Sequence, residues 1–564
     1  MCGLFATYLK NIDTQVTDRL NLRGLRSLKH RGPDRQGYFT TQDGNVFLGH
    51  SLLSVSTQHA DEGKQPIRTN KWAMVYNGEI YNHRHLREKL TALGIFFEGD
   101  SDTETLLRGI DHLGWAFLDT VEGCWALVAY DLNSGRLFFS RDPLGEKQLI
   151  YTVNRDGLTL ASEAKAIRAV RGQLELNNER IFSDLIFDFF SNRESTYFRN
   201  LNNCIPGKVY QYDQFSEAPK IVHTIRLVSK SPDYALRRKL ANAVSSMVPE
   251  HHDHALVLSG GLDSGIIASL LKTEMQDKPF TAITAAYLDS DNEDLRYAKQ
   301  LVNHLGHINH HVLHIGATDI EDHFESVQYA LEEPLLDQVY VTQYLIYKHL
   351  SNLGLRVALN GQGADEFWGG YYYHYNLQKF YSTADHERVI NHFQLIAERR
   401  GIHSLLTQLE IETIIQHNLE FRWSHIDTLQ SILMEGHLQA MLSHEDKLSM
   451  ASGVEVRLPF LNQDLVVHAL NLSTEEKIYQ GIEKTPLRAA MKGILLDNIR
   501  LRRKQAFPDA PKAAYMKLPL LQHLAPTNSF FSKSDIKHLA QATPAMEWRM
   551  NAVNAFSGAF TKGV

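Results

Sequence analysis

A glycine-rich turn, set between an apolar run and a helical stretch, constrains the fold of this chain more than any other feature. Residues 254–258 are largely apolar, and residues 259–264 read Ser-Gly-Gly-Leu-Asp-Ser before the helical stretch begins. Further apolar runs at 280–287, 311–315 and 356–359 alternate with helical segments, which is typical of a parallel sheet. We therefore expect an α/β domain in this half of the chain.

The same turn is suited to holding a phosphate. Glycines let backbone N–H groups approach an oxyanion, and the N-terminus of the following helix adds partial positive charge. No Lys-Ser/Thr pair ends the turn, so it is not a Walker loop. The alternative is a tight turn that needs glycine for its shape alone.

A second acidic segment follows another predicted strand. Residues 360–366 read Asn-Gly-Gln-Gly-Ala-Asp-Glu directly after the run at 356–359. Ligands of open α/β sheets bind at the carboxyl ends of the strands. Asp263 and Asp365 would meet at that edge and could hold Mg²⁺ through oxygen ligands. Asp263 could instead cap the helix that follows it.

The first 200 residues have a different pattern, with short strands, turns and helix-like stretches at 82–93 and 102–113. The predicted strands cover residues 46–48, 72–76, 125–130, 137–139, 149–152 and 158–161. This pattern predicts an α+β layered domain over residues 2–215, followed by the α/β domain over residues 216–564. From residue 371 onward we expect mostly helix.

Composition excludes several classes of protein. The chain has 564 residues, 43% of them hydrophobic, and a net charge of −7, which disfavours a strongly basic nucleic-acid binder. No apolar run is long enough to span a membrane, and the first residues do not resemble a signal peptide. Cys2, Cys124 and Cys204 make no disulfide framework. We expect a cytoplasmic protein with neither nucleic-acid nor membrane partners.

Cys2 is placed where it could act as a nucleophile. A small second residue permits removal of Met1, which would leave Cys2 with a free α-amine. Such an amine has a pKa of about 7.7–8.0 and can act as a base for the adjacent thiol near neutral pH. A cysteine at this position by chance is the alternative.

The motifs that follow Cys2 carry a resemblance to a known family. In chain order they are Cys2-Gly3-Leu4-Phe5, Arg31-Gly32-Pro33-Asp34, Asn77-Gly78-Glu79-Ile80-Tyr81-Asn82, Ser101-Asp102-Thr103-Glu104, Arg141-Asp142 and Ala161-Ser162-Glu163. Together they resemble a class II glutamine amidotransferase domain of the N-terminal-nucleophile hydrolases, which have αββα layers. The turn at 259–264 resembles the pyrophosphate loop of the ATP pyrophosphatases. The order of the two domains is similar to that of the glutamine-hydrolysing asparagine synthetase family, and the resemblance covers nearly the whole chain.

The resemblance implies a glutaminase site in the first domain. Cys2 would attack the side-chain amide of glutamine, and Asn77 and Gly78 would form the oxyanion hole. Glu79 and Asp102 would hold the amino group of the substrate. The released ammonia would then pass inside the protein to the second domain.

The resemblance also implies a synthetase site, where ATP and Mg²⁺ activate a carboxylate and ammonia displaces AMP to give an amide. The residues that match ATP contacts of the family are Leu258, Ser259, Gly260, Gly261, Asp263, Ser264, Ile283, Asn360 and Gly361. Asp263 and Asp365 match its Mg²⁺ ligands. Glu332 matches a glutamate of the amide-forming step, although the adjacent Glu333 remains an alternative, and Lys484 matches a lysine that stabilises charge in the transition state.

Four departures from the family pattern leave alternatives open. Leu52 stands where the family has an arginine that pairs with the α-carboxylate of glutamine, and Arg31 or Arg68 could replace that cation. The other three are Gln148, Gln362 in the segment 360–363, and Asn462. The resemblance implies aspartate as the acceptor, but a carboxylate in a secondary-metabolite or polysaccharide pathway, and a catalytically silent binding protein, are the alternatives. A homodimer also remains open.

Overall fold

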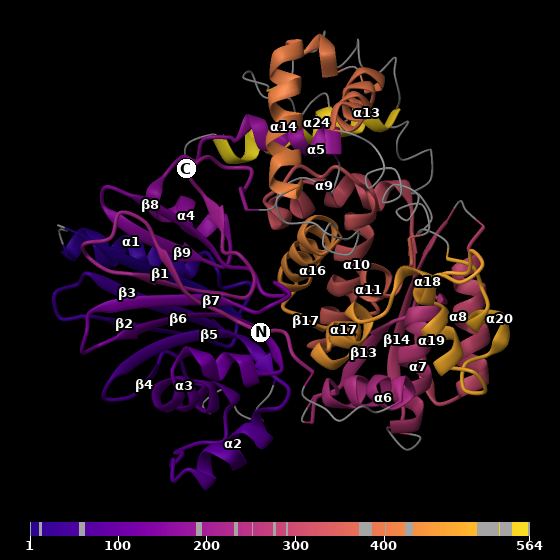
Figure 1. The fold of residues 1–564 in the computed structure, drawn as a ribbon, viewed down its shortest axis with the longest axis horizontal. Coiled ribbons are helices and arrows are strands. Elements are labelled where there is room, and N and C mark those ends of the chain that lie inside the picture. The colour runs from indigo at the N-terminus through magenta and orange to yellow at the C-terminus, as the bar shows by residue number, and fades with distance from the viewer. Residues whose placement is uncertain are drawn as a thin grey trace.

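The computed structural model shows two units side by side, one built on antiparallel sheets and the other on a parallel sheet with helices (Figure 1). The residues that the structure describes are 2–10, 14–55, 63–187, 194–229, 235–250, 252–274, 278–288, 291–371, 386–400, 402–423, 433–504, 530 and 544–561. All statements below concern these residues.

Two antiparallel sheets of six strands each form the N-terminal unit. Sheet A runs in the order β10 (Asn202–Asn203), β8 (Ile150–Asn154), β9 (Gly157–Ala161), β1 (Cys2–Leu9), β3 (Val46–Leu52) and β2 (Arg35–Thr40). Sheet B runs in the order β12 (Lys220–Thr224), β11 (Lys208–Tyr212), β7 (Arg136–Arg141), β6 (Gly123–Asp131), β5 (Trp72–Ile80) and β4 (Ile67–Arg68).

The alternation of side chains along the strands explains why these sheets stack. On β1, Leu4 and Ala6 belong to the core between the sheets, whereas Phe5 packs among the helices on the other face. Helices α1 (Thr14–Arg26) and α4 (Ala164–Arg171) cover sheet A, and α2 (His83–Ala92) and α3 (Asp102–Leu113) cover sheet B. The expected αββα layering is therefore confirmed.

A five-stranded parallel sheet, sheet C, lies at the centre of the C-terminal unit. Its order is β15 (Ile308–Ile315), β14 (Phe280–Tyr287), β13 (His254–Val257), β16 (Val357–Leu359) and β17 (Glu455–Arg457). The helices around it include α6 (Leu236–Ser246), α7 (Leu262–Glu274), α8 (Glu293–Leu305), α9 (Ala317–Leu331) and α10 (Val339–Asn352). The α/β class is confirmed. β17 lies in the part of the chain that was expected to be helical. It was not predicted as a strand because its three residues have only one apolar side chain, between two charged ones.

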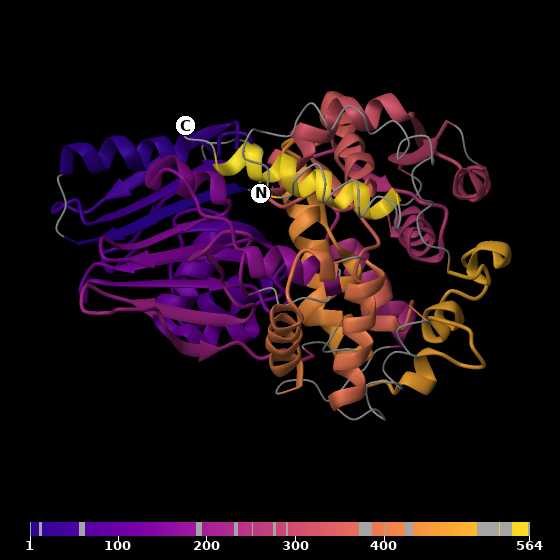
Figure 2. The same ribbon diagram turned by 90° about the horizontal axis from the view of Figure 1, so that it is seen from above.

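The C-terminal helices reach back to the first unit. Helices α13 (His386–Arg399), α14 (Gln408–Trp423) and α24 (Pro544–Thr561) share a core with α5 (Asn178–Phe187). Arg168 on α4 donates to the carbonyl oxygen of Ala559 at 3.0 Å, so α24 touches both units (Figure 2). The boundary expected near residue 215 falls between β11 and β12, which pair in one sheet, and that sheet ends at Thr224.

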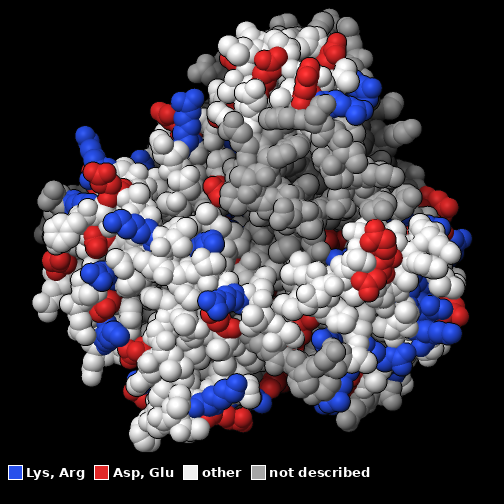
Figure 3. All heavy atoms as spheres, in the orientation of Figure 1, with Lys and Arg blue, Asp and Glu red and all other residues white. Residues whose placement is uncertain are grey.

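The charged side chains on one face of the molecule do not separate by sign (Figure 3). On the face drawn in Figure 3, acidic and basic side chains of the described residues are intermixed over both units. None of the helices described combines the length and apolar character needed to cross a bilayer.

Candidate active sites

Cys2 lies where sheets A and B meet. It begins β1, pairs in register with Leu52 on β3, and is only 6% exposed. Its backbone nitrogen donates to Oδ1 of Asn77 on β5 at 2.7 Å. The other side-chain atom of that amide, Nδ2 of Asn77, is buried and has no hydrogen-bond partner among the described residues. A buried, unused donor beside a thiol is suited to stabilising an oxyanion.

Gly78 follows Asn77 and cannot be replaced without moving a strand. It pairs with Trp125 on β6, and a Cβ at this position would lie 2.1 Å from the carbonyl oxygen of Cys124. Real Cβ atoms do not approach backbone so closely, so β5 and β6 keep their spacing only with glycine here. The sequence therefore needs glycine beside Asn77 for packing as well as for any chemistry.

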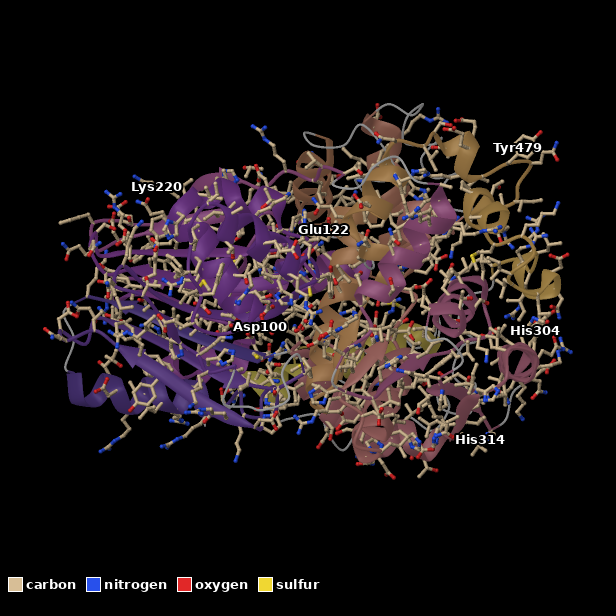
Figure 4. All side chains as sticks on the ribbon, turned by 90° about the horizontal axis from the view of Figure 1, so that it is seen from below. Asp100, Glu122, Lys220, His304, His314 and Tyr479 are labelled. Atoms are coloured by element: carbon tan, nitrogen blue, oxygen red, sulfur yellow. The ribbon has the colours of Figure 1, made fainter. Side chains whose placement is uncertain are left out.

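Glu79 and Asp102 face a common cavity of about 820 Å³ between the two units. Asp102 begins α3, and its Oδ2 accepts hydrogen bonds from the hydroxyl of Tyr76 at 3.2 Å and the backbone of Ile80 at 3.1 Å. Asp100, labelled in Figure 4, belongs to the same lining. Several carboxylates in one cavity favour a ligand that carries a positive charge.

Burial dominates the electrostatics around Cys2. It raises the pKa of the Cys2 thiol, so the thiolate needs a base or a charged substrate to form. Burial also raises the pKa of Glu79 to about 8; Arg457 opposes this shift, and the carboxylates of Glu455 and Asp102 add to it. A cationic ligand would therefore bind Glu79 and ionise it in the same step.

The two arginines expected to replace the cation of the family are both engaged elsewhere. Arg31 is fully buried and donates to the carboxylates of Glu163 and Asp446 at 2.8 Å each. Arg68 is exposed on β4, with its guanidinium 4.8 Å from the ring centroid of Phe39. Neither arginine lines the cavity with Glu79.

The predicted phosphate loop joins β13 to α7. Oγ of Ser264 accepts a hydrogen bond from the backbone of Ser259 at 3.2 Å and lies 3.1 Å from the Ser259 hydroxyl oxygen. Gly260 has φ +74°, and a Cβ there would lie 2.3 Å from the carbonyl oxygen of Asp294. The loop thus holds its tight shape through hydroxyl contacts and a glycine that no other residue can replace without strain.

The remaining predicted nucleotide contacts surround this loop. Leu258 donates its backbone N–H to the carbonyl oxygen of Ile283 at 2.8 Å, which continues the pairing of β13 with β14. Asn360 and Gly361 follow β16, the next strand of the sheet. A Cβ on Gly361 would lie 3.0 Å from Cβ of Asp263, so the two loops pack closely.

Lys484 joins the two aspartates predicted at this edge. Its Nζ lies 2.6 Å from Oδ2 of Asp263 and 2.6 Å from Oδ1 of Asp365. Lys504 binds Oδ2 of Asp365 at 2.7 Å. Lys484 has a left-handed backbone with φ 56°, and such strain clusters at functional sites. Burial raises the pKa of Asp263, whereas Lys484 and Lys504 overcome burial and lower the pKa of Asp365.

The donor set here fits a hard divalent cation. Two carboxylates from adjacent loops converge, and Oδ1 of Asp263 is buried with no hydrogen-bond partner among the described residues. Carboxylate oxygens are the ligands that Mg²⁺ takes together with phosphate oxygens. Asp263 and Asp365 are thus the residues that would hold such an ion.

Basic residues beyond those predicted complete this site. A cavity of about 120 Å³ is lined by Ser259, Gly261, Leu262, Asp263, Asp294, Lys484, Arg488, Arg502, Arg503 and Lys504. Arg502 binds Asp294 at 2.7 Å, which fixes it beside Gly260. Five cations around a glycine-rich loop are suited to a polyphosphate. The three consecutive basic residues at 502–504 are the sequence feature that could have indicated this part of the site. Nothing in their spacing links them to the loop at 259–264.

Glu332 lies apart from this cluster. Its carboxylate accepts hydrogen bonds from the backbone of Ala164 at 2.7 Å and Lys165 at 2.6 Å, at the start of α4 in the N-terminal unit. It has φ 56° and is 3% exposed. The neighbouring Glu333 pairs with His444 at 3.1 Å. Both glutamates line a small cavity between the units that contains neither Asp263 nor Lys484.

Comparisons with known proteins agree with this two-site architecture. The family model described as asparagine synthase matches residues 235–540, and the glutamine amidotransferase domain model matches residues 1–220. Asparagine synthetase [glutamine-hydrolyzing] 1 of Bacillus subtilis (strain 168) is 26% identical over 562 residues, covering 90% of this chain and 87% of that protein. Asparagine synthetase B [glutamine-hydrolyzing] of Escherichia coli (strain K12) is 26% identical over 526 residues, covering 90% and 82%.

Among solved structures, the glutamine phosphoribosylpyrophosphate amidotransferase from B. subtilis is similar at 16% identity and a TM-score of 0.31. The match covers 56% of this chain and 81% of the chain of that structure. The asparagine synthase model alone spans more than half of the sequence. The chain belongs to the asparagine synthase family.

Proposed function

We propose that this protein is an ATP-dependent, glutamine-hydrolysing amide synthetase that converts aspartate to asparagine, with release of AMP, pyrophosphate and glutamate. The observation that carries the proposal is the cluster of Asp263, Lys484 and Asp365 beside a glycine-rich loop, in the same chain as a buried Cys2. We assign the glutaminase site to the unit that ends at Thr224 and the synthetase site to the unit from α6 onward. The enzyme acts in the cytoplasm.

The first half-reaction takes place at Cys2 after removal of Met1. The free α-amine accepts the thiol proton, and the sulfur attacks the side-chain carbonyl carbon of glutamine. Nδ2 of Asn77 and the backbone of Gly78 stabilise the oxyanion, and the C–N bond breaks as the leaving nitrogen takes a proton to form ammonia. Water then hydrolyses the thioester to glutamate. Glu79 and Asp102 hold the α-ammonium group.

The second half-reaction takes place at the edge of sheet C. A carboxylate oxygen of the acceptor attacks the α-phosphorus of ATP, and pyrophosphate leaves along the loop at 259–264. Mg²⁺ bound by Asp263 and Asp365 would neutralise charge on the phosphates. Lys484 stabilises the negative charge that develops in the transition state. Ammonia then attacks the acyl-adenylate carbon, the bond to AMP breaks, and the leaving AMP takes up a proton from the attacking nitrogen.

Product analysis tests the proposal directly. The enzyme is incubated with ATP, glutamine and a panel of carboxylates that includes aspartate. The expected result is asparagine formed in step with AMP and pyrophosphate. ADP and inorganic phosphate as products would contradict the pyrophosphatase assignment. Amide formation on another carboxylate, with none on aspartate, would leave the chemistry intact and change the acceptor.

Substitution of Asp365 separates the two sites. Asp365→Asn removes a charge that binds both Lys484 and Lys504, and it weakens the proposed hold on Mg²⁺. We expect amide synthesis to be lost with either glutamine or ammonia as nitrogen source, while glutamine hydrolysis continues. Glutamate release and amide formation are measured in the same samples. Synthesis at the wild-type rate would exclude a role for Asp365 in the nucleotide site.

A further inference from the structure

The cavity that holds Glu79 and Asp102 is completed by the C-terminal unit. Its lining combines residues 79–85 and 99–102 of the first unit with Ser246, Val248, Pro249, Glu250 and Arg457 of the second. An α-amino acid presents an ammonium and a carboxylate on one carbon, so its site needs a cation beside the anions. Glu79 and Asp102 supply the carboxyl groups that face the ammonium.

Two arginines line this cavity, and they differ in burial. Arg84 lies on α2 with 64% of its side chain exposed and is paired with Glu250 at the rim. Arg457 lies on β17 with 3% of its side chain exposed. A charge pair made with Arg84 would be screened by solvent, whereas a pair made with Arg457 would be desolvated and strong.

The guanidinium of Arg457 is held in place but not fully used. Nε donates to Glu455 at 2.7 Å, and Nη1 donates to the carbonyl oxygen of Met247 at 3.1 Å. Nη2 lies 3.5 Å from Oε2 of Glu79 and makes no hydrogen bond with any described residue. Nε and Nη1 are therefore fixed by the C-terminal unit, while Nη2 lies nearest to Glu79, which lines the same cavity.

We propose that Arg457 binds the α-carboxylate of the amide donor, so that a residue of the synthetase unit determines glutamine specificity in the glutaminase site. This inference rests on the proposed function. Arg457 and Glu79 already lie 3.5 Å apart in the cavity. A zwitterionic amino acid can enter between them, with its ammonium on the carboxylate that Glu79 then forms and its carboxylate on Nη2. Leu52 can therefore be apolar.

The position of Arg457 also connects the two sites. Its carbonyl oxygen accepts a hydrogen bond from the backbone of Asn360 at 3.1 Å, where the nucleotide loop after β16 begins. One residue thus contacts the glutamine cavity through its side chain and the synthetase loop through its backbone.

The test compares two amide donors in the full-length enzyme. 4-Aminobutanamide is glutamine without its α-carboxylate, so the ratio of kcat/KM for the two donors measures recognition of that group. Arg457→Met should lower kcat/KM for glutamine by roughly 30-fold or more. The value for 4-aminobutanamide should change by less than about 3-fold, because this donor lacks the group that Arg457 binds. Arg457→Lys keeps the charge without the planar fork and should give an intermediate ratio.

Two further variants complete the experiment. Arg84→Met is the matched control and should leave the ratio unchanged. Leu52→Arg in the Arg457→Met background places a guanidinium beside Cys2 and should restore much of the preference for glutamine. Synthesis supported by free ammonia reports whether each variant is folded.

The outcomes distinguish the inference from the proposed function. A parallel loss with both donors would mean that Arg457 supports only the structure, and a loss of preference in Arg84→Met would assign the role to Arg84. A wild-type enzyme that hydrolyses both donors equally would also overturn the inference, although the proposed function would stand. Hydrolysis of neither donor by the wild type would overturn both.

Discussion

At the scale of single residues, the groups of the glutaminase site and the groups of the synthetase site have separate sets of bonding partners. Cys2 is bonded through its backbone to Asn77, and Lys484 is bonded to Asp263 and Asp365. No described contact joins one set directly to the other. Each chemistry should therefore be removable by itself.

Replacing the nucleophile tests this independence. Cys2→Ala removes the sulfur but keeps the backbone bond to Asn77, so the fold around β1 should be retained. We expect glutamine hydrolysis to fall to background, while amide synthesis from added ammonia stays within about 2-fold of the wild type. Loss of ammonia-supported synthesis in a folded variant would show that Cys2 also serves the second reaction.

A buried carboxyl behind the nucleotide loop should make stability depend on pH. Glu445 accepts hydrogen bonds from Tyr347, Gln343 and Asn360, and burial raises its pKa to about 7 in spite of them. Since the folded pKa lies above the unfolded value of 4.5, the folded state binds the proton more tightly. Stability from this group is present below about pH 4.5 and is lost as pH rises through 7.

The expected loss between those limits is about 3 kcal/mol. Glu445→Gln cannot ionise and should therefore lose less stability than the wild type between pH 5 and pH 8, as measured by thermal unfolding at both values. Other titrating groups are shared by the two proteins and cancel in the comparison. Identical pH dependence of the two Tm values would mean that Glu445 is ionised throughout.

At the scale of elements, the end of α11 (Ala364–Trp368) sets the geometry of the synthetase site. Gly370 follows this helix, and a Cβ there would lie 1.9 Å from Oδ1 of Asp365 and 2.6 Å from Cε of Lys484. Only a residue without a side chain lets the chain turn past this ion pair. The backbone at Gly370 therefore determines the geometry of the ion pair between Asp365 and Lys484 together with their charges.

Gly370→Ala should therefore disable the synthetase site although it changes none of the charged residues. The added methyl must displace Asp365 or Lys484, so we expect amide synthesis to fall by at least about 10²-fold, the size of effect that a misplacement of 1 Å can have. Glutamine hydrolysis in the same preparation is the internal control and should be unchanged. Equal loss of both activities would indicate a folding defect.

The sequence predicted those elements whose structure is determined by a local pattern of residues. The buried strands β13, β14 and β16 were recognisable from apolar runs, and the meeting of Asp263 with Asp365 follows from the adjacency of β13 and β16. β1 was not among the strands predicted from the sequence, although its side chains alternate between the two faces of sheet A. β17 is stabilised by its pairing with β16, and its own three residues carry little signal.

The parts of the sites that escaped prediction come from distant segments. Arg457 reaches Glu79 from β17, and Lys504 reaches Asp365 from beyond α20 (Asp497–Arg500). No periodicity or spacing within one segment can reveal such contacts, because tertiary packing alone creates them. Likewise, the two buried carboxylates that bind Arg31 come from segments far from it in the sequence.

At the scale of the whole molecule, a buried ion cluster joins the two units behind Cys2. Arg31 is fully buried, binds Glu163 of the first unit and Asp446 of the second, and donates from Nε to the carbonyl oxygen of Cys2 at 3.1 Å. The nucleophile is therefore braced by a contact between units. Arg84 and Glu250 form a second bridge between the units, but both side chains are largely exposed.

These two bridges should differ greatly in their contribution to stability. Asp446→Asn leaves the buried guanidinium of Arg31 with one carboxylate instead of two, and breaking a buried pair costs about 3–5 kcal/mol. Glu250→Gln removes an exposed pair worth at most about 1 kcal/mol. Thermal unfolding should thus show a much larger drop in Tm for Asp446→Asn. Glutamine hydrolysis should fall in that variant alone, because Arg31 then holds Cys2 less firmly. Equal changes in Tm would mean that solvent or another group compensates for the lost carboxylate, and unchanged hydrolysis would show that Cys2 is positioned without this cluster.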